Sequence, residues 1–172
     1  MVLDGHAQGI FGIDFSPNGY QIATGSSDDT VRIWDMRSLR ALHTIPAHKS
    51  TISDVKFFRR ASKPTDYVKA EDVTMGEEED VKPLLNGEAN PTDGAPSVNL
   101  ADDKYQSGLY LITSGYDGLV KIWSADDWQL VKAMATDAGK VMSTDISSDG
   151  MFIASGSWNR SYQLFAGDNV VM

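Results

Sequence analysis

Alternating apolar and polar residues fill short runs along this chain, and small polar turns separate the runs. In residues 20–35 (YQIATGSSDDTVRIWD) two alternating runs flank the polar turn SSDD. Two such runs joined by a short turn are typical of a β-hairpin. The last twelve residues of this stretch recur without a gap at residues 113–124 and 155–166. The pattern therefore predicts an all-β chain built from repeated hairpins.

The spacing of matching residues gives the length of the repeat. His6 and His48 are 42 residues apart, whereas Trp34 and Trp123 are 89 residues apart, which is 47 more than one period. A period near 42 with Gly-His at its start and Trp-Asp at its end is the signature of a β-propeller blade. The sequence thus resembles the WD-repeat family. This resemblance implies four strands per blade. The 47 additional residues predict an insertion in the second blade.

The repeats predict three blades, at residues 1–46, 47–135 and 136–172. A propeller has about 4–8 blades, so three leave an open face. We therefore expect a partial WD-repeat β-propeller that is a fragment of a seven-bladed one. Its third blade is expected to be incomplete, because only residues 167–172 remain for a fourth strand. The predicted strands are 10–15, 20–25, 30–35 and 41–45, then 52–58, 110–114, 119–123 and 128–134, and finally 141–146, 151–155 and 161–165.

The predicted insertion, residues 59–107, differs in composition from the rest of the chain. Residues 62–107 hold six Asp, five Glu and four Lys, which accounts for −7 of the formal net charge of −9. Low hydrophobicity with high net charge predicts disorder. The insertion joins the first two strands of its blade. In a propeller it is therefore expected on the face opposite the histidine and the aspartate of the motif. It is either a solvated loop or a docking segment for a basic partner.

The resemblance to the WD-repeat family implies that four polar residues in each blade form a hydrogen-bonded structural set. A buried tryptophan N–H and a threonine hydroxyl need partners, and an imidazole can accept from one and donate to a turn aspartate. In the third blade Asp137, Asn159 and Phe165 replace three of these residues, so apolar packing is expected to hold it. The assigned residues are His6, Thr24, Asp28 and Trp34 in the first blade, His48, Thr113, Asp117 and Trp123 in the second, and Ser155 in the third.

Threonine, histidine and aspartate together also suggest a catalytic triad. An active site would occur once, however, and this set occurs in two blades. The sequence has no nucleophile elbow, no phosphate-binding loop, no metal-ligand spacing and no cysteine. We therefore predict no catalytic, cofactor-binding or metal-binding residues and no small-molecule substrate. No apolar run is long enough to span a bilayer, so no membrane partner is expected.

Three stretches, through the residues that lie between the signature positions, resemble one particular WD-repeat family, the WD-repeat component of the spliceosomal U4/U6 small nuclear ribonucleoprotein. They are residues 16–38 (SPNGYQIATGSSDDTVRIWDMRS), 44–50 (TIPAHKS) and 139–155 (GKVMSTDISSDGMFIAS). The resemblance implies a nuclear, non-catalytic scaffold in pre-mRNA splicing. Its partners would be splicing proteins of the U4/U6 and tri-snRNP particles, with U4 and U6 snRNA reached through the complex.

Other functions stay open at this point. Another intracellular WD-repeat adaptor, such as a ubiquitin-ligase substrate receptor or a chromatin adaptor, would have the same repeats. An enzyme would need an activity that depends on the motif histidines. A direct RNA-binding protein would need a basic surface, and the acidic composition argues against one.

The residue before each turn aspartate faces the upper rim of the propeller in WD-repeat families. Here these residues are Ser27, Tyr116 and Trp158, and exposed aromatic rings of this kind are enriched at interfaces. Lys49 and Lys140, in the loops before the first strands of blades two and three, are expected to flank them. The five residues are therefore predicted to bind a partner protein. The alternative is that the two rings only cover neighbouring turns.

Overall fold

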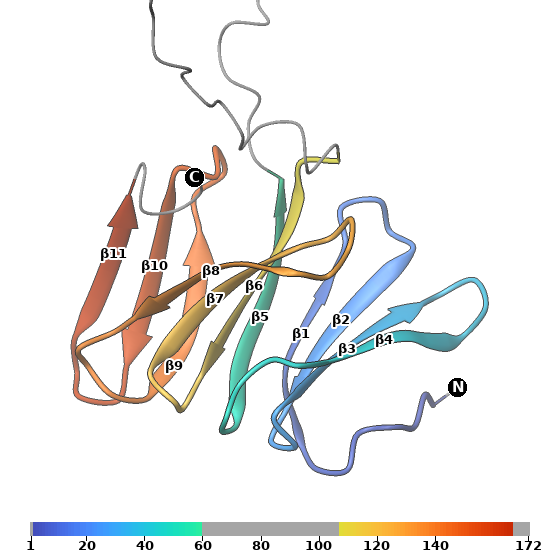
Figure 1. Cartoon of the computed structure of the whole chain (residues 1–172), viewed down its shortest axis with the longest axis horizontal. Helices are drawn as coiled ribbons and strands as arrows, with labels where there is room; N and C mark the ends of the chain where they lie inside the picture. Colours follow the sequence, from blue (N-terminus) through green and yellow to red (C-terminus); the bar gives the residue numbers. More distant parts are fainter. Residues whose placement is uncertain (1, 60–106, 167–172) are drawn as a thin grey trace, which may run out of the picture.

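The computed structural model describes residues 2–59 and 107–166. The predicted disorder of the insertion and the predicted incompleteness beyond residue 166 lie outside these residues. Within them the chain forms three antiparallel sheets and no helix that is long and apolar enough to cross a membrane. Figure 1 shows the sheets side by side in chain order. The all-β prediction and the partial propeller are confirmed.

The first sheet has the order β1-β2-β3-β4, the second β5-β6-β7-β8 and the third β9-β10-β11. The observed bounds differ from the predicted ones by at most two residues. The strands are β1 (Ile10–Phe15), β2 (Gln21–Ser26), β3 (Thr30–Asp35), β4 (Arg40–Pro46), β5 (Ile52–Arg59), β6 (Leu109–Gly115), β7 (Leu119–Ser124), β8 (Leu130–Ala135), β9 (Val141–Ile146), β10 (Phe152–Ser157) and β11 (Tyr162–Ala166).

Trp128 was expected to begin the last strand of the second sheet, but it lies in the turn before β8. Its backbone has φ of 56°, a left-handed conformation that a strand cannot contain. Its ring packs instead against Phe57 and against His43 of the first sheet, with ring centroids 6.4 and 5.7 Å apart. Trp128 therefore joins two sheets.

The registers of the three sheets match one another. A β-bulge interrupts the pairing of the first two strands at the same repeat position in each sheet, beside Ile10, Ile52 and Val141. After the bulge, Thr24, Thr113 and Ser155 face Ile13, Val55 and Thr144. Equivalent residues of the repeat can therefore be compared directly across the three sheets.

Each pair of neighbouring sheets encloses a hydrophobic cluster. The second sheet turns a rear face toward the first sheet and a front face toward the third. Val55, Phe57 and Leu111 of the rear face are buried with the first sheet's Val31 and Ile33. The front face packs on the third sheet through the residues Phe58, Tyr110, Ile112, Val120 and Ile122, which meet Val141 and Ile153.

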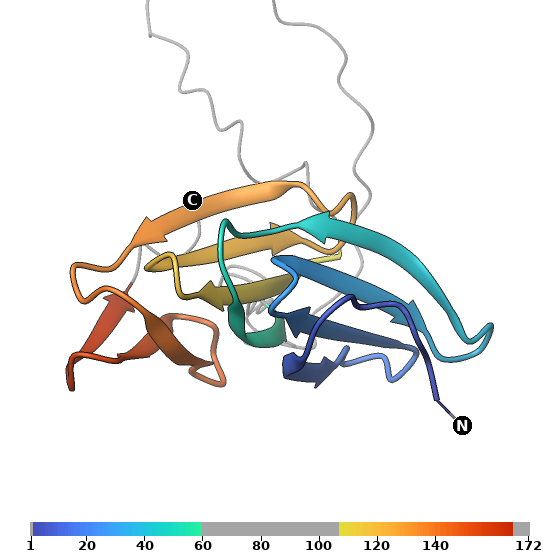
Figure 2. The same ribbon diagram turned by 90° about the horizontal axis from the view of Figure 1, so that it is seen from below.

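The first strands of the three sheets lie next to one another and are tied by aspartates. β1 contacts β5, and β5 contacts β9. The Phe57 N–H donates to Asp14 Oδ2 at 2.7 Å, and the Thr144 N–H donates to Asp54 Oδ2 at 3.1 Å. In Figure 2, β4 and β8 run along the opposite side of the molecule. The sheets thus fan out from their first strands, as the blades of a propeller do.

The rear face of the first sheet and the front face of the third have no neighbouring sheet among the described residues. Their apolar side chains are exposed, as the prediction of an open face requires. On the first sheet these are Ile10, Ile13, Phe15 and Tyr20, and on the third sheet Phe152, Tyr162 and Leu164.

Candidate functional site

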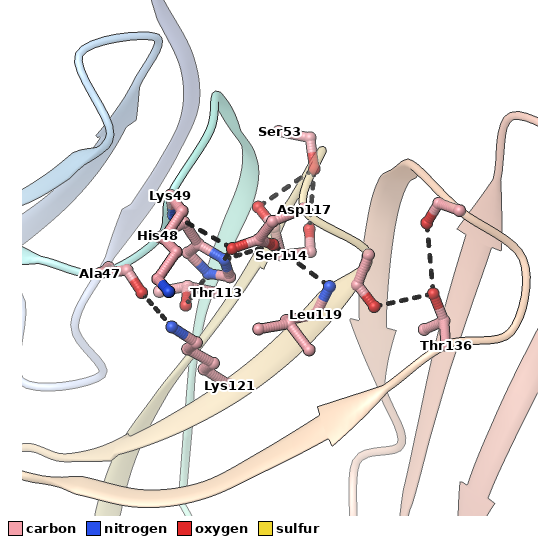
Figure 3. Close-up of polar contacts among 12 residues, drawn as sticks. Ala47, His48, Lys49, Ser53, Thr113, Ser114, Asp117, Leu119, Lys121 and Thr136 are labelled. Atoms are coloured by element: carbon pink, nitrogen blue, oxygen red, sulfur yellow. Dashed lines mark hydrogen bonds and ion pairs between the residues drawn. The ribbon is translucent and has the colours of Figure 1, made fainter.

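The second sheet contains a continuous hydrogen-bonded network that begins in the loop before β5 (Figure 3). His48 Nδ1 lies 2.9 Å from Asp117 Oδ1, and His48 Nε2 lies 2.8 Å from Thr113 Oγ1. The Trp123 indole N–H donates to the same Thr113 oxygen at 3.0 Å. Because this oxygen accepts from the indole, its own proton is available to His48 Nε2, and His48 Nδ1 donates to the aspartate.

The first sheet repeats this network with the equivalent residues. His6 Nδ1 lies 2.9 Å from Asp28 Oδ2, and His6 Nε2 lies 2.7 Å from Thr24 Oγ1. The Trp34 indole N–H donates to Thr24 Oγ1 at 2.8 Å. Thr30 adds a further bond, donating its hydroxyl to Asp28 Oδ1 at 2.6 Å. The structure therefore brings together all four assigned residues in each of these two sheets.

The turn aspartates of both networks are held in their charged form. Burial alone would raise the pKa of Asp28, but bonds from the Thr30 hydroxyl, the Ala7 N–H and His6 outweigh it and hold the pKa well below its usual range. At Asp117, burial again acts to raise the pKa. The bonds from His48 and the Lys49 N–H prevail and lower it. Each aspartate thereby fixes the loop before the first strand of its own sheet.

His48 is almost fully enclosed, and its surroundings favour the neutral imidazole. Burial lowers the pKa of His48 from its ordinary value, although the hydrogen bond and charge of Asp117 act in the opposite direction. A neutral ring with one donor and one acceptor nitrogen suits the two bonds that it makes. The network therefore works as a set of fixed structural bonds.

The third sheet has no such network, so the assignment of Ser155 to a structural set is wrong. Ser155 is buried at the same position as Thr113, but its hydroxyl has no hydrogen-bond partner among the described residues. Asp137 is exposed, Asn159 accepts bonds from Ser161 in its own turn, and the Phe165 ring has no N–H to donate. Thr144, Ser157 and Gln163 of this sheet also have a buried side-chain oxygen atom without a partner. Packing of Val141 and Ile153 on the second sheet holds this sheet in place.

The residues predicted to form the rim occupy equivalent backbone positions. The N–H groups of Ser27, Tyr116 and Trp158 each donate to the carbonyl group just before the first strand of a sheet. The acceptors are Gly9 O at 2.9 Å, Thr51 O at 2.9 Å and Lys140 O at 3.0 Å. Because the acceptors are also equivalent, the three side chains emerge at the same place on successive sheets.

The rim side chains differ in their exposure. Trp158 is 73% exposed, and no ring contact involving it is found among the described residues. Tyr116, which was expected to be exposed, is only partly so, because Lys140 Nζ lies 5.1 Å from the centre of its ring. Ser27 Oγ lies 3.3 Å from Thr51 Oγ1 on the neighbouring sheet. Lys49 is exposed, and its N–H donates to Asp117 Oδ2.

Sequence reasoning missed several polar contacts near these networks. Lys121 Nζ donates to the Ala47 carbonyl group, and the Thr136 hydroxyl donates to the Gly118 carbonyl group at 2.9 Å. These pairs are far apart in sequence or join turns of two sheets, so local pattern gives no signal for them. The hydrogen bond between Thr30 and Asp28 could have been predicted from the sequence, because a threonine two residues after a turn aspartate commonly bonds to it.

The described residues offer little to reaction chemistry. Residues 2–59 and 107–166 contain no group of three or more histidine, cysteine, aspartate or glutamate side chains placed to hold a metal ion. Thr113 and Thr24, beside the histidines, are 0% and 5% exposed, and their hydroxyl groups are already hydrogen-bonded. A substrate cannot reach them without opening the sheet.

The comparisons agree with this architecture. The protein family described as "WD domain, G-beta repeat" matches residues 1–35, 101–124 and 128–165, which together are more than half of the chain. The chain therefore belongs to the WD-repeat family, whose fold and repeated polar residues it contains.

The individual relatives have names of different kinds, two that refer to RNA and one that refers to guanine nucleotides. The yeast Saccharomyces cerevisiae protein "U4/U6 small nuclear ribonucleoprotein PRP4" is 37% identical over 62 residues, or 36% of this chain and 13% of its own length. "Pre-mRNA-processing factor 19" of rice is 28% identical over 88% of this chain and 29% of its own length. The rice "guanine nucleotide-binding protein subunit beta" is 27% identical over 94% of this chain and 45% of its own length. The chain thus spans less than half of each.

Proposed function

We propose that the chain is a non-catalytic interaction scaffold that binds a partner protein through the rim formed by Ser27, Lys49, Tyr116, Lys140 and Trp158. The observation that carries this proposal is the exposed indole of Trp158. It lies in a turn of the third sheet, and the equivalent turns of the first and second sheets carry Ser27 and Tyr116. Tryptophan and tyrosine are the residue types that most often dominate binding energy. The histidine networks beneath the rim keep the loops in place without taking part in chemistry.

We further propose that this scaffold acts in the nucleus, in pre-mRNA splicing, within the U4/U6 small nuclear ribonucleoprotein. The residue stretches 16–38, 44–50 and 139–155 support this role, as does the likeness to a yeast protein named for that particle. The likeness to a pre-mRNA-processing factor supports splicing more broadly. The acidic composition favours protein partners, with U4 and U6 snRNA held through the complex.

Co-purification from nuclear extract tests the splicing role. The chain with an affinity tag is recovered from cells of its own source, and U4, U6 and U1 snRNA are measured in the eluate. The proposal expects U4 and U6 to be enriched together and U1 to stay at the background of an untagged extract. Equal recovery of all three, or of none, contradicts it.

Substitution at the rim tests the binding surface separately. Trp158→Ala with Lys140→Glu should weaken partner recovery by about tenfold or more, as expected for a hot-spot residue. Leu130→Ala is the matched control, because Leu130 is also apolar and exposed, at 46%, but lies on β8. Unchanged recovery with the rim variant would contradict this surface, even if the snRNAs still co-purify.

The competing function is that of another WD-repeat adaptor, such as a ubiquitin-ligase substrate receptor, a chromatin adaptor or a signalling subunit. The rice guanine nucleotide-binding protein subunit favours this class, because the match extends over 94% of the chain. The same purification distinguishes the two, since ligase, histone or G-protein partners without snRNA would favour the adaptor.

A further inference from the structure

Three exposed cations lie at the rim of the second and third sheets. Lys49 and Lys140 belong to the rim, and Arg160 follows it in the turn after β10. No ion pair to any of the three is found among the described residues. In the described part of the same loops and turns, one aspartate is exposed, Asp137. The charges of the three cations are therefore available to a ligand.

Printed backbone and ring contacts join these cations to the two aromatic rings of the rim. Lys140 Nζ lies 5.1 Å from the centre of the Tyr116 ring, and the Lys140 carbonyl group accepts the Trp158 N–H at 3.0 Å. Arg160 lies two residues after Trp158 in the same turn. The Tyr116 N–H in turn donates to the loop before β5, whose Lys49 is labelled in Figure 3. Cations and rings thus form one continuous surface.

The other carboxylates of this region already accept hydrogen bonds within the chain. Asp117 Oδ2 accepts the Lys49 N–H at 3.1 Å, and Asp117 Oδ1 lies 2.9 Å from His48 Nδ1. Asp54 Oδ2 accepts the Thr144 N–H at 3.1 Å. New charge-assisted bonds to a ligand must therefore come from the cations.

One turn position changes its charge from sheet to sheet. Asp29 occupies it in the first sheet, Gly118 in the second and Arg160 in the third, with φ of 66°, 78° and 69°. This left-handed backbone suits glycine and is unfavourable for arginine. Residues held in such a conformation are concentrated at functional sites. The third sheet thus places a cation where the backbone alone would favour glycine.

We propose that the rim of the second and third sheets binds an acidic peptide segment of a partner protein. Its carboxylates pair with Lys49, Lys140 and Arg160, and one of its apolar side chains packs on Trp158. A guanidinium group can bind a carboxylate through two parallel hydrogen bonds. This acidic ligand rests on the function proposed above, and Arg160 joins the rim as a further binding residue.

Single-stranded RNA fits this surface less well. Proteins that bind it combine aromatic rings with a positively charged groove that follows the backbone over several nucleotides. The cations at this rim end at the second sheet, since the equivalent turn of the first sheet carries Asp29. A short acidic peptide needs only the two sheets that carry them.

A charge exchange between two turns tests this ligand without altering the net charge of the chain. Arg160→Asp with Asp29→Arg moves the cation from the third sheet to the first. Both residue types already adopt this turn with a positive φ, so the exchange should preserve the fold. Circular dichroism checks it, and if the variant fails to fold, Lys49→Gln with Arg160→Gly replaces it.

Fluorescence anisotropy of the full chain measures binding of a labelled peptide that alternates glutamate with glycine and contains one phenylalanine. The unmodified chain should bind this peptide about fivefold or more tightly than the same peptide with glutamine in place of glutamate. The charge exchange should weaken binding about fivefold at low ionic strength. At about 1 M salt, where the Debye length is about 3 Å, the two chains should bind alike.

Three results would overturn the proposal. Equal affinity for the glutamate and glutamine peptides would exclude acidic recognition, and an unchanged Kd after the charge exchange would exclude Arg160. Tighter binding of an oligouridylate than of the glutamate peptide would assign the surface to nucleic acid. Partner recovery with Trp158→Ala and Lys140→Glu separates these failures from failure of the proposed function. Lost recovery keeps the rim as the binding surface and refutes only its acidic ligand, whereas normal recovery refutes the rim itself.

Discussion

The Oγ1 atom of Thr113 lies 3.0 Å from Nε1 of Trp123 and is the only acceptor found for this indole among the described residues. The two residues belong to neighbouring strands, β6 and β7, and both are buried. The same hydroxyl group also meets His48 at 2.8 Å. One small side chain thus connects the strand pair to the loop before β5.

Thr113→Val should reduce the free energy of unfolding by about 1–3 kcal/mol, because it preserves shape but leaves two buried polar groups without a partner. Urea denaturation measures the change. Ser155→Ala is the matched control at the equivalent position of the third sheet. No partner for its hydroxyl is found in the described part of the chain, so the change should stay within about 0.5 kcal/mol. Equal losses in both variants would show that the network adds no stability.

Trp34→Ala should cost about 3–5 kcal/mol, because a large aromatic side chain that is 5% exposed leaves a cavity when it is removed. The comparison is Trp158→Ala, where the same substitution removes a ring that is 73% exposed. Its effect on the urea midpoint should be small. A thermal or urea midpoint of Trp34→Ala equal to that of the unmodified chain would contradict the packing of the first sheet.

Lowering the pH from 7 to 5 should destabilise the chain through His48. Its pKa is lower in the folded chain than the ordinary value of 6.5, so the unfolded chain binds more protons below that pH. The contribution is complete above about pH 6.5 and falls with decreasing pH by at most about 1.4 kcal/mol per pH unit. His48→Gln should show a shallower slope of unfolding free energy between pH 5 and 6.5. An identical slope would mean that His48 does not titrate on unfolding.

Gly118→Ala should reduce the free energy of unfolding by about 1–2 kcal/mol, because Gly118 has φ of 78°. A Cβ there would also lie 3.1 Å from the Gly139 carbonyl oxygen. Arg160 occupies the equivalent turn position of the third sheet with φ of 69°, so Arg160→Gly should be neutral or stabilising. Urea denaturation of both variants checks the pair, and destabilisation by Arg160→Gly would contradict the turn geometry.

Much of the fold could be predicted because the signals are local and repeated. Alternation fixed each strand to within two residues, and the period aligned the sheets. The prediction was wrong where the structure depends on a distant contact. Tryptophan is a residue type that is common in strands, but Trp128 lies in a turn and packs on His43 of another sheet. Lys140, which was expected to flank the rim residues, lies over the ring of Tyr116, and how far it reduces the exposure of that ring was not predictable from the sequence.

The sequence by itself determined the repeat, the all-β class, and the residues available for the histidine networks, because residue type and spacing are properties of the chain. Only the tertiary structure decided which of those residues bond. Ser155 matches Thr113 in position and carries a hydroxyl, but its sheet lacks both the imidazole and the indole that would meet it. The tertiary structure also decided exposure. Phe15 and Phe57 are equivalent in sequence, but within residues 2–59 and 107–166 only Phe57 has a neighbouring sheet to cover it.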